Sequence, residues 1–550
     1  MSALPLPGIT RVKIAVNAGP AWDEQWRPGS DLLLVAENAE IAPESIAEMQ
    51  DVLHLHERHG AVSPRSSSSG LLSLPPDKSN LSKETAFEIW QRVGGMLARY
   101  QVVPSVAPEC TLIKSRALEW IGGFDQSFDS FTGALEDFVC RMNRRGFSAV
   151  VANRAFVSSG ARPGSSERDG DTLLYRYPEY EYKFARFDDF ERDPLERFAA
   201  LYTAHRPRIL YDLFHLSDKH SGTSEFGLSL LAALAHQLES FADLVVGAHL
   251  SNRFFLPELA GYRIYDETGG QAEVFDLAFK PCQLLSWADF RRLDSLAPRM
   301  AFTLQDIIGI RCDYLNAPER QFVVEQAVEM ADCVFSISNF SSSDFAARFG
   351  QQPAFRTIYH GTNYGYRQEE SLAGEHVLVV GNEFAHKGLA DVLRYVPDEL
   401  PLVVLGSVVG DVPVSVRSIP SGSASRQHLR DLFSRASVVI YPSYYEGFGL
   451  PVIDALALGK PVVVLDTEIN RELQNLLSDP NLHRVANFEE LPVLLNQLMS
   501  TPVRRPMQVR RWSDAAAEYA TVFRELLGRK IDPEKVRSRR ALLRLIASGS

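Results

Sequence analysis

Cysteine is scarce in this sequence, and long hydrophobic runs are missing. Only 5 of the 550 residues are cysteine, an odd number without any CxxC spacing, so we expect thiols buried in the core rather than a disulfide framework or a structural zinc site. The longest apolar stretches, such as Leu228–Ala235 and Leu402–Leu405, fall far below the roughly 18 residues that a membrane-spanning helix needs. The N-terminus has no charged segment followed by an apolar one, so no secretory signal is predicted. We therefore expect a cytoplasmic protein.

Positive charge is not in excess either. The chain has 57 lysines and arginines against 69 aspartates and glutamates, a formal net charge of −12. This balance argues against a general attraction to nucleic acid or to an anionic bilayer. Basic residues do gather after Arg529, interleaved with leucine and isoleucine, and as a helix this tail would be amphipathic. It could dock on the protein through its leucines, or contact an anionic membrane or a partner.

The alternation of short apolar runs with helical-period segments predicts an α/β fold. With 45% hydrophobic residues, the 550-residue chain can fill three or four cores of about 150 residues each. Continuous apolar runs are typical of parallel strands that are covered on both faces. The expected strands are Leu32–Ala36, Ala149–Ala152, Arg208–Phe214, Asp243–Val246, Val377–Val380, Leu402–Leu405, Val438–Tyr441 and Pro461–Leu465.

Two breaks divide the chain into blocks. Residues 158–171 are small, polar and Gly-rich, and a second break falls near Tyr364–Glu375. Between the first two blocks, residues 175–202 are crowded with aromatic and charged side chains, which favours a connector that lies on a surface. We expect an N-terminal domain over residues 1–172, a connector over 173–205, two further domains over 206–365 and 366–528, and a basic tail over 529–550.

The most informative stretch is 438–466, VVIYPSYYEGFGLPVIDALALGKPVVVLD. It predicts a buried strand, a loop, a helix and a second strand, with Pro451 at the helix start and Gly459 just past its end. A helix N-terminus at the carboxyl end of a parallel strand favours a diphosphate, because its free N–H groups and dipole attract negative charge. Gly447 and Gly449 would let a ligand approach the loop backbone closely.

Two carboxylates accompany this helix, Glu446 in the loop and Asp454 in the first turns, and both suit sugar or ribose hydroxyls. The stretch resembles the donor-site motif of family 4 retaining glycosyltransferases of the GT-B fold, a Glu followed eight positions later by another Glu. The resemblance implies that Glu446 lies against the donor sugar and that Asp454, one methylene shorter than Glu, binds the nucleotide ribose. It also assigns to the donor site Gly447, Phe448, Gly449 and Leu450.

Other segments resemble the same family in order and spacing. HVLVVGNEFAHKGLADVL is similar to its basic phosphate-binding element, which makes Lys387 the phosphate contact, whereas Asn382 and His386 occupy the loop where an Arg is often found. The segment RILYDLFHLSDKHSGTSEFGLSL is similar to the strand, loop and helix that cover the donor diphosphate, so Gly222 and Thr223 become donor-binding candidates.

The segment TLQDIIGI occupies the place where the family commonly has His-Asp after a strand. The resemblance therefore passes the role of holding the reacting sugar to Gln305 and Asp306. It covers about Arg206 to Leu527 and implies two Rossmann-like domains that close on a nucleotide-sugar. Transfer would retain the anomeric configuration, with no metal or other cofactor at this site. The acceptor hydroxyl would attack from the leaving group's side, and Glu446 would orient the donor and stabilise charge.

The N-terminal block carries a second resemblance. Segments DLLLVAENAEIAPESI, GAVSPRSSSSG and ALEDFVCRMNRRGFSAVVANRAFV look like the later half of a family 2 glycosyltransferase of the GT-A fold. By position, Glu136-Asp137 is the acidic pair near the acceptor. The metal-holding DxD region is ENAE (37–40) here, and serines 158 and 159 stand where a His is expected. We expect an incomplete, degenerate domain with a structural or acceptor-guiding role; the alternatives are activity with a partner, or a true start further upstream.

These resemblances imply a bacterial-type cytoplasmic glycosyltransferase that elongates a lipid-linked surface polysaccharide, such as an O-antigen, capsule or exopolysaccharide. Its partners would be a nucleotide-sugar donor and a saccharide or lipid-linked acceptor, without nucleic acid. Peripheral contact with the inner membrane or with other polysaccharide enzymes is an additional expectation. The alternatives are a transferase for a small soluble acceptor and a non-catalytic carbohydrate-binding or assembly subunit. The sugar, the nucleotide base, the linkage and the oligomeric state depend on features that the motifs do not encode.

Overall fold

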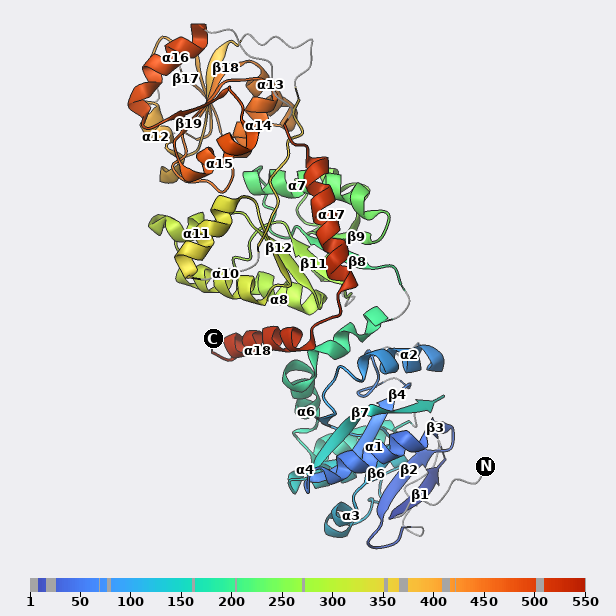
Figure 1. Ribbon diagram of the computed structural model, residues 1–550. Helices are drawn as coiled ribbons and strands as arrows, with labels where there is room; N and C mark the ends of the chain where they lie inside the picture. The colour runs from blue at the N-terminus through green and yellow to red at the C-terminus, as the bar shows by residue number, and fades with distance from the viewer. Residues whose placement is uncertain are drawn as a thin grey trace. The chain divides into compact units, whose positions relative to one another are not determined.

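A computed structural model shows two α/β units, one of residues 1–205 and 532–550 and one of residues 206–531 (Figure 1). The α/β class predicted from the sequence is confirmed. The described residues are 8–15, 26–68, 70–76, 81–160, 164–202, 205–269, 273–350, 355–365, 374–407, 416–420, 422–500 and 509–549.

The first unit is built on a mixed seven-stranded sheet with the order β1-β2-β6-β4-β7-β3, and β5 pairs with β7. Here the expectation of a parallel sheet is wrong, because β6 pairs antiparallel with both β2 and β4, and β7 pairs antiparallel with β3 and β5. The strands are β1 Ile9–Ile14, β2 Asp31–Ala36, β3 Ala39–Ile41, β4 His59–Ser66, β5 Tyr100–Val103, β6 Cys110–Ile113 and β7 Ser148–Ser159.

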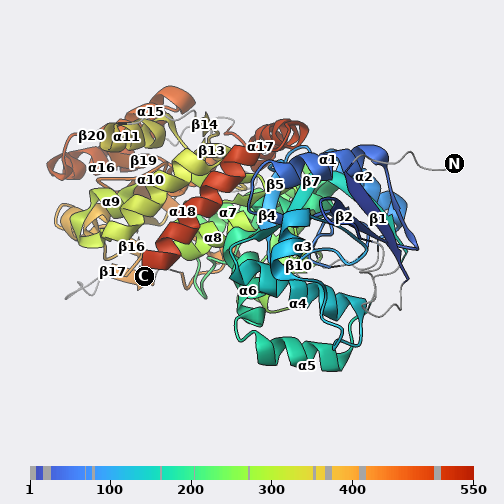
Figure 2. The ribbon, with the colours of Figure 1, turned by 90° about the horizontal axis from the view of Figure 1, so that it is seen from below.

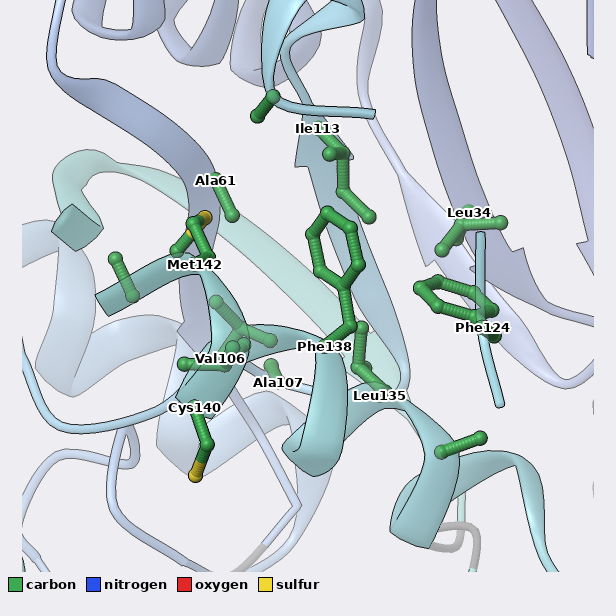
Figure 3. Close-up of a cluster of buried hydrophobic side chains, with 14 of the residues drawn as sticks. Leu34, Ala61, Val106, Ala107, Ile113, Phe124, Leu135, Phe138, Cys140 and Met142 are labelled. Atoms are coloured by element: carbon green, nitrogen blue, oxygen red, sulfur yellow. The ribbon is translucent and has the colours of Figure 1, made fainter. Parts of the chain in front are cut away.

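Helices cover this sheet. The helix α4 begins after Ser130, whose hydroxyl accepts a hydrogen bond from the N–H of Gly133. Its apolar face packs Phe138 and Leu135 toward Ala61 and Ile113 of the strands (Figure 3), and α5 lies beside it (Figure 2). The helices are α1 Pro43–His54, α2 Lys83–Val93, α3 Ser115–Ile121, α4 Phe131–Arg144, α5 Glu167–Arg176, α6 Tyr180–Arg186 and α18 Pro533–Gly549.

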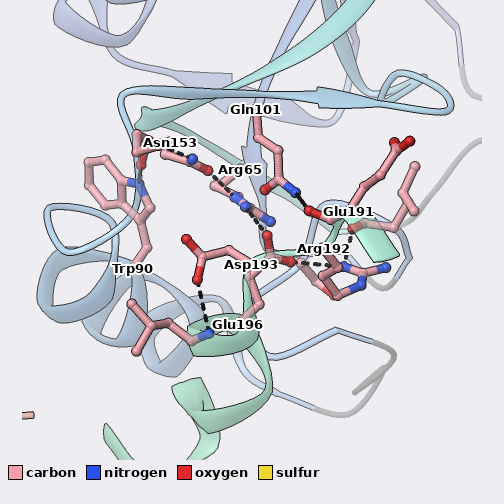
Figure 4. A network of polar contacts seen from close by, with 12 residues as sticks. Arg65, Trp90, Gln101, Asn153, Glu191, Arg192, Asp193 and Glu196 are labelled. Atoms are coloured by element: carbon pink, nitrogen blue, oxygen red, sulfur yellow. Dashed lines mark hydrogen bonds and ion pairs between the residues drawn. The ribbon is translucent and has the colours of Figure 1, made fainter. Parts of the chain in front are cut away.

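The expected connector, residues 173–205, packs as part of this unit. It forms the end of α5, α6, a π-helical turn at Phe187–Glu191 and a 3-10 helix at Pro194–Tyr202. The side chain of Glu196 is 0% exposed and accepts from Arg65, which is 1% exposed, at 2.6 Å (Figure 4). Arg192 donates to the second oxygen of Glu196 at 2.8 Å. A buried ion pair that is hydrogen-bonded in this way fixes the segment to β4.

The basic tail forms the helix α18, which docks within the first unit. Val536 and Leu543 are buried and Arg539 is 0% exposed. Arg537 donates to the carboxylate of Asp193 at 2.9 Å. Docking of the tail on the protein is therefore confirmed, through arginines as well as Leu543, and contact with a membrane or a partner stays a prediction.

The first half of the second unit has a parallel sheet with the order β10-β9-β8-β11-β12-β13-β14, as expected for a Rossmann-like domain. Its strands are β8 Arg208–Asp212, β9 Asp243–Gly247, β10 Arg263–Tyr265, β11 Leu277–Lys280, β12 Met300–Leu304, β13 Cys333–Ser336 and β14 Arg356–Thr357. Its helices are α7 Gly222–Leu238, α8 Trp287–Leu296, α9 Ile308–Arg311, α10 Pro318–Met330 and α11 Asn339–Phe349.

The second half has another parallel sheet, with the order β17-β16-β15-β18-β19-β20. Its strands are β15 His376–Val380, β16 Leu402–Leu405, β17 Val416–Ile419, β18 Ala436–Tyr441, β19 Val462–Leu465 and β20 Leu482–Val485. The helices are α12 Leu389–Val392, α13 Arg426–Ser434, α14 Leu450–Ala457, α15 Glu468–Leu477, α16 Leu491–Ser500 and α17 Trp512–Gly528. The prediction of two Rossmann-like domains is confirmed.

Helix α17 follows the second sheet but joins the core of the first half, beside α7 (Figure 1). Tyr519 and Phe523 pack against Phe279 and Phe335 of the first sheet. The chain therefore passes twice between the halves, once near residue 360 and once at the start of α17. None of the helices in the described part of the chain combines the length and apolar composition that crossing a bilayer requires.

The cysteines are free thiols. The expectation of burial is confirmed for Cys110, Cys140 and Cys282, whereas Cys312 and Cys333 are half-buried.

Candidate active site

A cavity of about 400 Å³ lies between the two halves of the second unit. The first half contributes the N-terminal turns of α7 and the residues after β12, and the second half contributes the residues after β15 and β18. These are carboxyl ends of parallel strands, where α/β proteins bind ligands. All of the residues that the first resemblance predicts for the site line this cavity, namely Glu446, Asp306, Gln305, Lys387, Asp454, Gly447, Phe448, Gly449, Leu450, Gly222 and Thr223.

The loop after β18 is shaped by two glycines. Gly449 has a φ of 104° and directly precedes the first residue of α14, a conformation that costs glycine little. At Gly447, a Cβ atom would lie 2.2 Å from the backbone oxygen of Gln305. The backbone of Gly447 also accepts a hydrogen bond from Ser338 at 2.7 Å. Gly447 lines the cavity, and the approach of a ligand to it stays a prediction; its backbone also packs against residues of the first half, directly beside Glu446.

Lys387 and Glu446 form an ion pair in the cavity wall. Lys387 ends a 3-10 turn, Ala385–Lys387, after β15, and Glu446 stands in the loop after β18. Burial opposes ionisation of Glu446, but the charge and hydrogen bond of Lys387, with the neighbouring hydroxyls of Ser443 and Tyr441, outweigh it, so its pKa lies below the ordinary value. The carboxylate is therefore anionic at neutral pH and faces a cation.

Asp306 stands near this pair, and its pKa is shifted in the other direction. Burial raises the pKa of Asp306 to about 6, and repulsion from Glu446 adds to the effect. The N–H of Ile308, which donates to Asp306 at 3.0 Å, acts in the opposite direction, as does Lys387. The site thus holds two carboxyl groups whose environments shift their pKa values in opposite directions, as is frequent in functional sites.

Gln305, which follows β12 in the cavity wall, forms a hydrogen bond with the first turn of α7. Its side-chain amide donates to the carbonyl of Pro281 at 3.2 Å, and its oxygen accepts from the hydroxyl of Thr223 at 3.0 Å. Gln305 therefore fixes the first turn of α7. The turn itself begins at Ser221, whose hydroxyl accepts from the N–H of Ser224 at 3.1 Å.

Asp454 lies on α14 and accepts a hydrogen bond from the hydroxyl of Thr362. Burial raises its pKa to about 7, and the negative charge of Glu225 adds to the shift. Glu225, on the first turn of α7, also lines the cavity and pairs with Arg426 of α13 at 3.0 Å. Neither Glu225 nor Arg426 was predicted from the sequence. The signal that could have pointed to them is their position, since each is a charged residue in the first turn of a helix that borders the site, α7 and α13.

In the loop between β15 and Lys387, Asn382 and His386 stand where the resembled family often has an Arg. Asn382 lines the cavity. His386 hydrogen-bonds through Nδ1 with the hydroxyl of Tyr314 at 2.7 Å, and burial together with Lys387 lowers its pKa to about 4. His386 is therefore neutral at pH 7 and supplies no second cation.

The acidic pair of the first unit is held by structural contacts. Glu136 accepts from the hydroxyl of Ser105 at 2.6 Å. Asp137, which is 1% exposed, accepts from Arg141 at 2.7 Å and from the hydroxyl of Tyr177 at 2.6 Å. In the described ranges, no three His, Cys, Asp or Glu side chains are grouped as metal ligands.

Comparison with known proteins places a match on the second half of the second unit. Residues 371–516 match the family model for glycosyl transferases group 1. The chain is 23% identical over 194 residues to the O-antigen chain mannosyltransferase RfbU of Salmonella typhimurium (strain LT2), covering 31% of this chain and 55% of that protein. It is 26% identical over 183 residues to the lipopolysaccharide glucosyltransferase WaaG of Escherichia coli (strain K12), covering 31% and 47%.

A third relative, the MMP alpha-(1->4)-mannosyltransferase of Mycolicibacterium hassiacum, is 29% identical over 120 residues, which cover 20% of this chain and 29% of that protein. The chain thus spans less than two thirds of the length of these curated relatives. Among solved structures, Anabaena Alr3699/HepE in complex with UDP and glucose is similar with a TM-score of 0.41 and 16% identity, over 62% of this chain and 100% of that one. The Glu446 loop, α14 and Lys387 all fall inside the segment that matches the group 1 glycosyl transferases.

Proposed function

We propose that this chain is a retaining glycosyltransferase that moves a sugar from a nucleotide-sugar to a growing, lipid-linked surface polysaccharide. The observation that carries the proposal is the Lys387–Glu446 ion pair, which borders one cavity together with Asp306 and the N-terminus of α14. This combination offers a cation and a helix dipole for a leaving diphosphate, and an anion for positive charge that develops on a sugar.

In the proposed reaction the diphosphate lies against Lys387 and the positive end of the α14 dipole. Glu446 faces the donor sugar, and its lowered pKa keeps it anionic while the anomeric carbon gains positive charge. The acceptor hydroxyl attacks that carbon from the side of the leaving group, and an oxygen of the departing phosphate takes its proton. The bond from the anomeric carbon to the diphosphate breaks, so the products are the glycosylated acceptor and the nucleoside diphosphate. No step in this route requires a metal ion.

The acceptor is proposed from the relatives. Two curated relatives are named O-antigen chain mannosyltransferases and a third a lipopolysaccharide glucosyltransferase, which favours a saccharide of the bacterial surface. Such acceptors are built on lipid carriers, so peripheral binding at the inner face of the membrane belongs to the proposal.

For the first unit we propose an incomplete GT-A-like domain without catalysis of its own. The support is the engagement of Asp137, whose carboxylate is held by Arg141, Arg176 and Tyr177. An acid that served as a base near an acceptor would need an oxygen that reaches substrate. A structural or acceptor-guiding role fits this arrangement.

The test is calorimetric binding of UDP-, GDP- and dTDP-sugars to the full chain, each with EDTA and with manganese. We expect one nucleotide-sugar to bind in EDTA and to bind more weakly to Glu446→Ala. Asp466→Ala is the matched control, because Asp466 is a partly exposed carboxylate of the same half, paired with Arg471 and Arg484. Binding that requires manganese and ignores Glu446 would contradict the assignment, and binding of none would favour a non-catalytic subunit.

A further inference from the structure

A second pair of carboxyl groups faces the cavity, apart from Glu446 and Asp306. Glu225 comes from α7 in the first half and Asp454 from α14 in the second half, and both line the cavity. The negative charge of Glu225 contributes to the raised pKa of Asp454. Two acids that approach one space from different elements form a site for a group with two neighbouring hydrogen-bond donors.

Glu225 is held in a fixed orientation. One oxygen accepts from the hydroxyl of Ser229 at 2.8 Å, and the other accepts from Nε of Arg426 at 3.0 Å. Asn363 donates to the hydroxyl oxygen of Ser229 at 3.0 Å and so holds the Ser229 side chain that binds Glu225. The side chain of Glu225 is nevertheless 33% exposed. A carboxylate oxygen can accept a second hydrogen bond, so Glu225 keeps capacity for a ligand.

Asp454 lines the cavity and already has a hydrogen-bond partner within the protein. Thr362, 1% exposed, donates its hydroxyl to Asp454 and accepts from the N–H of Tyr364 at 2.9 Å. Asp454 also has a shorter side chain than the Glu of the resembled motif, so its reach toward a ligand is reduced. A second acceptor is needed if two hydroxyls are to be bound here.

We propose that Glu225 acts with Asp454 as the second acceptor for the ribose hydroxyls of the donor, so that the site selects ribonucleotides over 2′-deoxyribonucleotides. This inference rests on the proposed function, since it names the nucleotide class at that same cavity. It excludes thymidine diphosphate sugars as preferred donors, because they lack the 2′-hydroxyl. It also assigns a role in specificity to a residue outside the segment that matches the group 1 family.

The size of the preference for ribonucleotides follows from the hydrogen bond between the 2′-hydroxyl and Glu225 that a deoxy ligand cannot form. A hydrogen bond to a charged group contributes enough for roughly a ten- to hundredfold change in affinity. A bound nucleotide without the 2′-hydroxyl would also shield Glu225 from water without offering it a donor, which penalises the deoxy ligand further.

The experiment compares UDP with 2′-deoxy-UDP and GDP with 2′-deoxy-GDP by calorimetry, on the wild type, Glu225→Ala and Glu258→Ala. Glu258 is a close control: it pairs with the same arginine, Arg426, at 3.1 Å and is 30% exposed, but it is not among the residues that line the cavity. We expect the wild type and Glu258→Ala to prefer the ribonucleotide by roughly tenfold or more, and Glu225→Ala to lose most of that preference.

The ratio of the two affinities is the readout, because removing a carboxylate also changes the charge of the cavity and acts on both ligands alike. Equal binding of the ribo and deoxy forms by the wild type would overturn the inference and leave the proposed function standing. A Glu225→Ala variant that keeps the preference, or a Glu258→Ala variant that loses it to the same extent, would overturn it as well. If no nucleotide binds to a wild type with a cooperative thermal transition, the proposed function fails and the inference with it.

Discussion

Substitution of Gly447 by alanine tests how the active-site loop is positioned. The added Cβ would lie 2.2 Å from the backbone oxygen of Gln305, 3.0 Å from Ile337 Cδ1 and 3.1 Å from Asp306 Cβ. The nearest of these is a backbone atom of a strand end, which cannot rotate away. The loop must therefore move by about 1 Å to reach ordinary van der Waals separation.

Glu446 directly precedes Gly447, so this movement displaces its carboxylate from Lys387. A misplacement of about 1 Å can lower a catalysed rate by about a hundredfold, and we expect a loss of this order in kcat/KM for sugar transfer. Ser338, which donates to the carbonyl of Gly447, loses its bond at the same time.

The assay is transfer from the preferred nucleotide-sugar, together with thermal unfolding of each variant. Gly528→Ala is the control, because nothing lies within 4 Å of a Cβ added there in the same unit, and it should keep full activity. If Gly447→Ala were as active as the wild type, the close approach of the loop to Gln305 would not matter for catalysis and the account of the site would be refuted.

Three other predictions follow from the contacts described. Glu196→Gln leaves Arg65 buried without its counter-charge, which costs about 3–5 kcal/mol of unfolding free energy in a buried pair; urea denaturation should show this, and a loss below 1 kcal/mol would contradict the burial. Lys387→Gln should weaken binding of the nucleoside diphosphate by roughly ten- to hundredfold in calorimetry, since a charge-assisted contact is removed; unchanged affinity would exclude Lys387 as the phosphate contact. Because burial raises the pKa of Asp454 to about 7, the folded state holds a proton that the unfolded chain loses near its ordinary pKa of about 3.9, so its contribution to stability is lost as the pH rises from about 4 to 7; Asp454→Asn should flatten the decline in stability over that same pH range, and an unchanged slope would refute this assignment.

The arrangement of the second unit could be predicted because its strands are continuous apolar runs. Leu402–Leu405 matches β16, and Val377–Val380 and Val438–Tyr441 fall within β15 and β18. Strands with polar or proline residues were missed. HGAVSPRS forms β4 with every residue buried, because its polar groups find partners such as Asn153 and Glu196 that the local sequence does not reveal.

The residues of the donor motif were predicted, but their contacts were not. Lys387 and Glu446 were each assigned from a short motif, yet their ion pair joins positions 59 apart. Glu225 was not predicted, because its partner Arg426 lies 201 positions away. The tail is a further case: its basic character was evident, but the carboxylate of Asp193 that binds Arg537 lies 344 positions earlier. Long-range pairing of charges depends on the assembled fold and leaves little trace in a single sequence.

Retention of configuration at the Lys387–Glu446 site is the central claim, and the anomer that is first released tests it most directly. The nucleotide-sugar that binds in EDTA is incubated with the full chain, water serving as acceptor, and the released sugar is followed by proton NMR before mutarotation. The account predicts release in EDTA of the same anomer as in the donor, and loss of release in Glu446→Ala while the nucleoside diphosphate still binds. Release of the opposite anomer, or release that continues unchanged in Glu446→Ala, would contradict it.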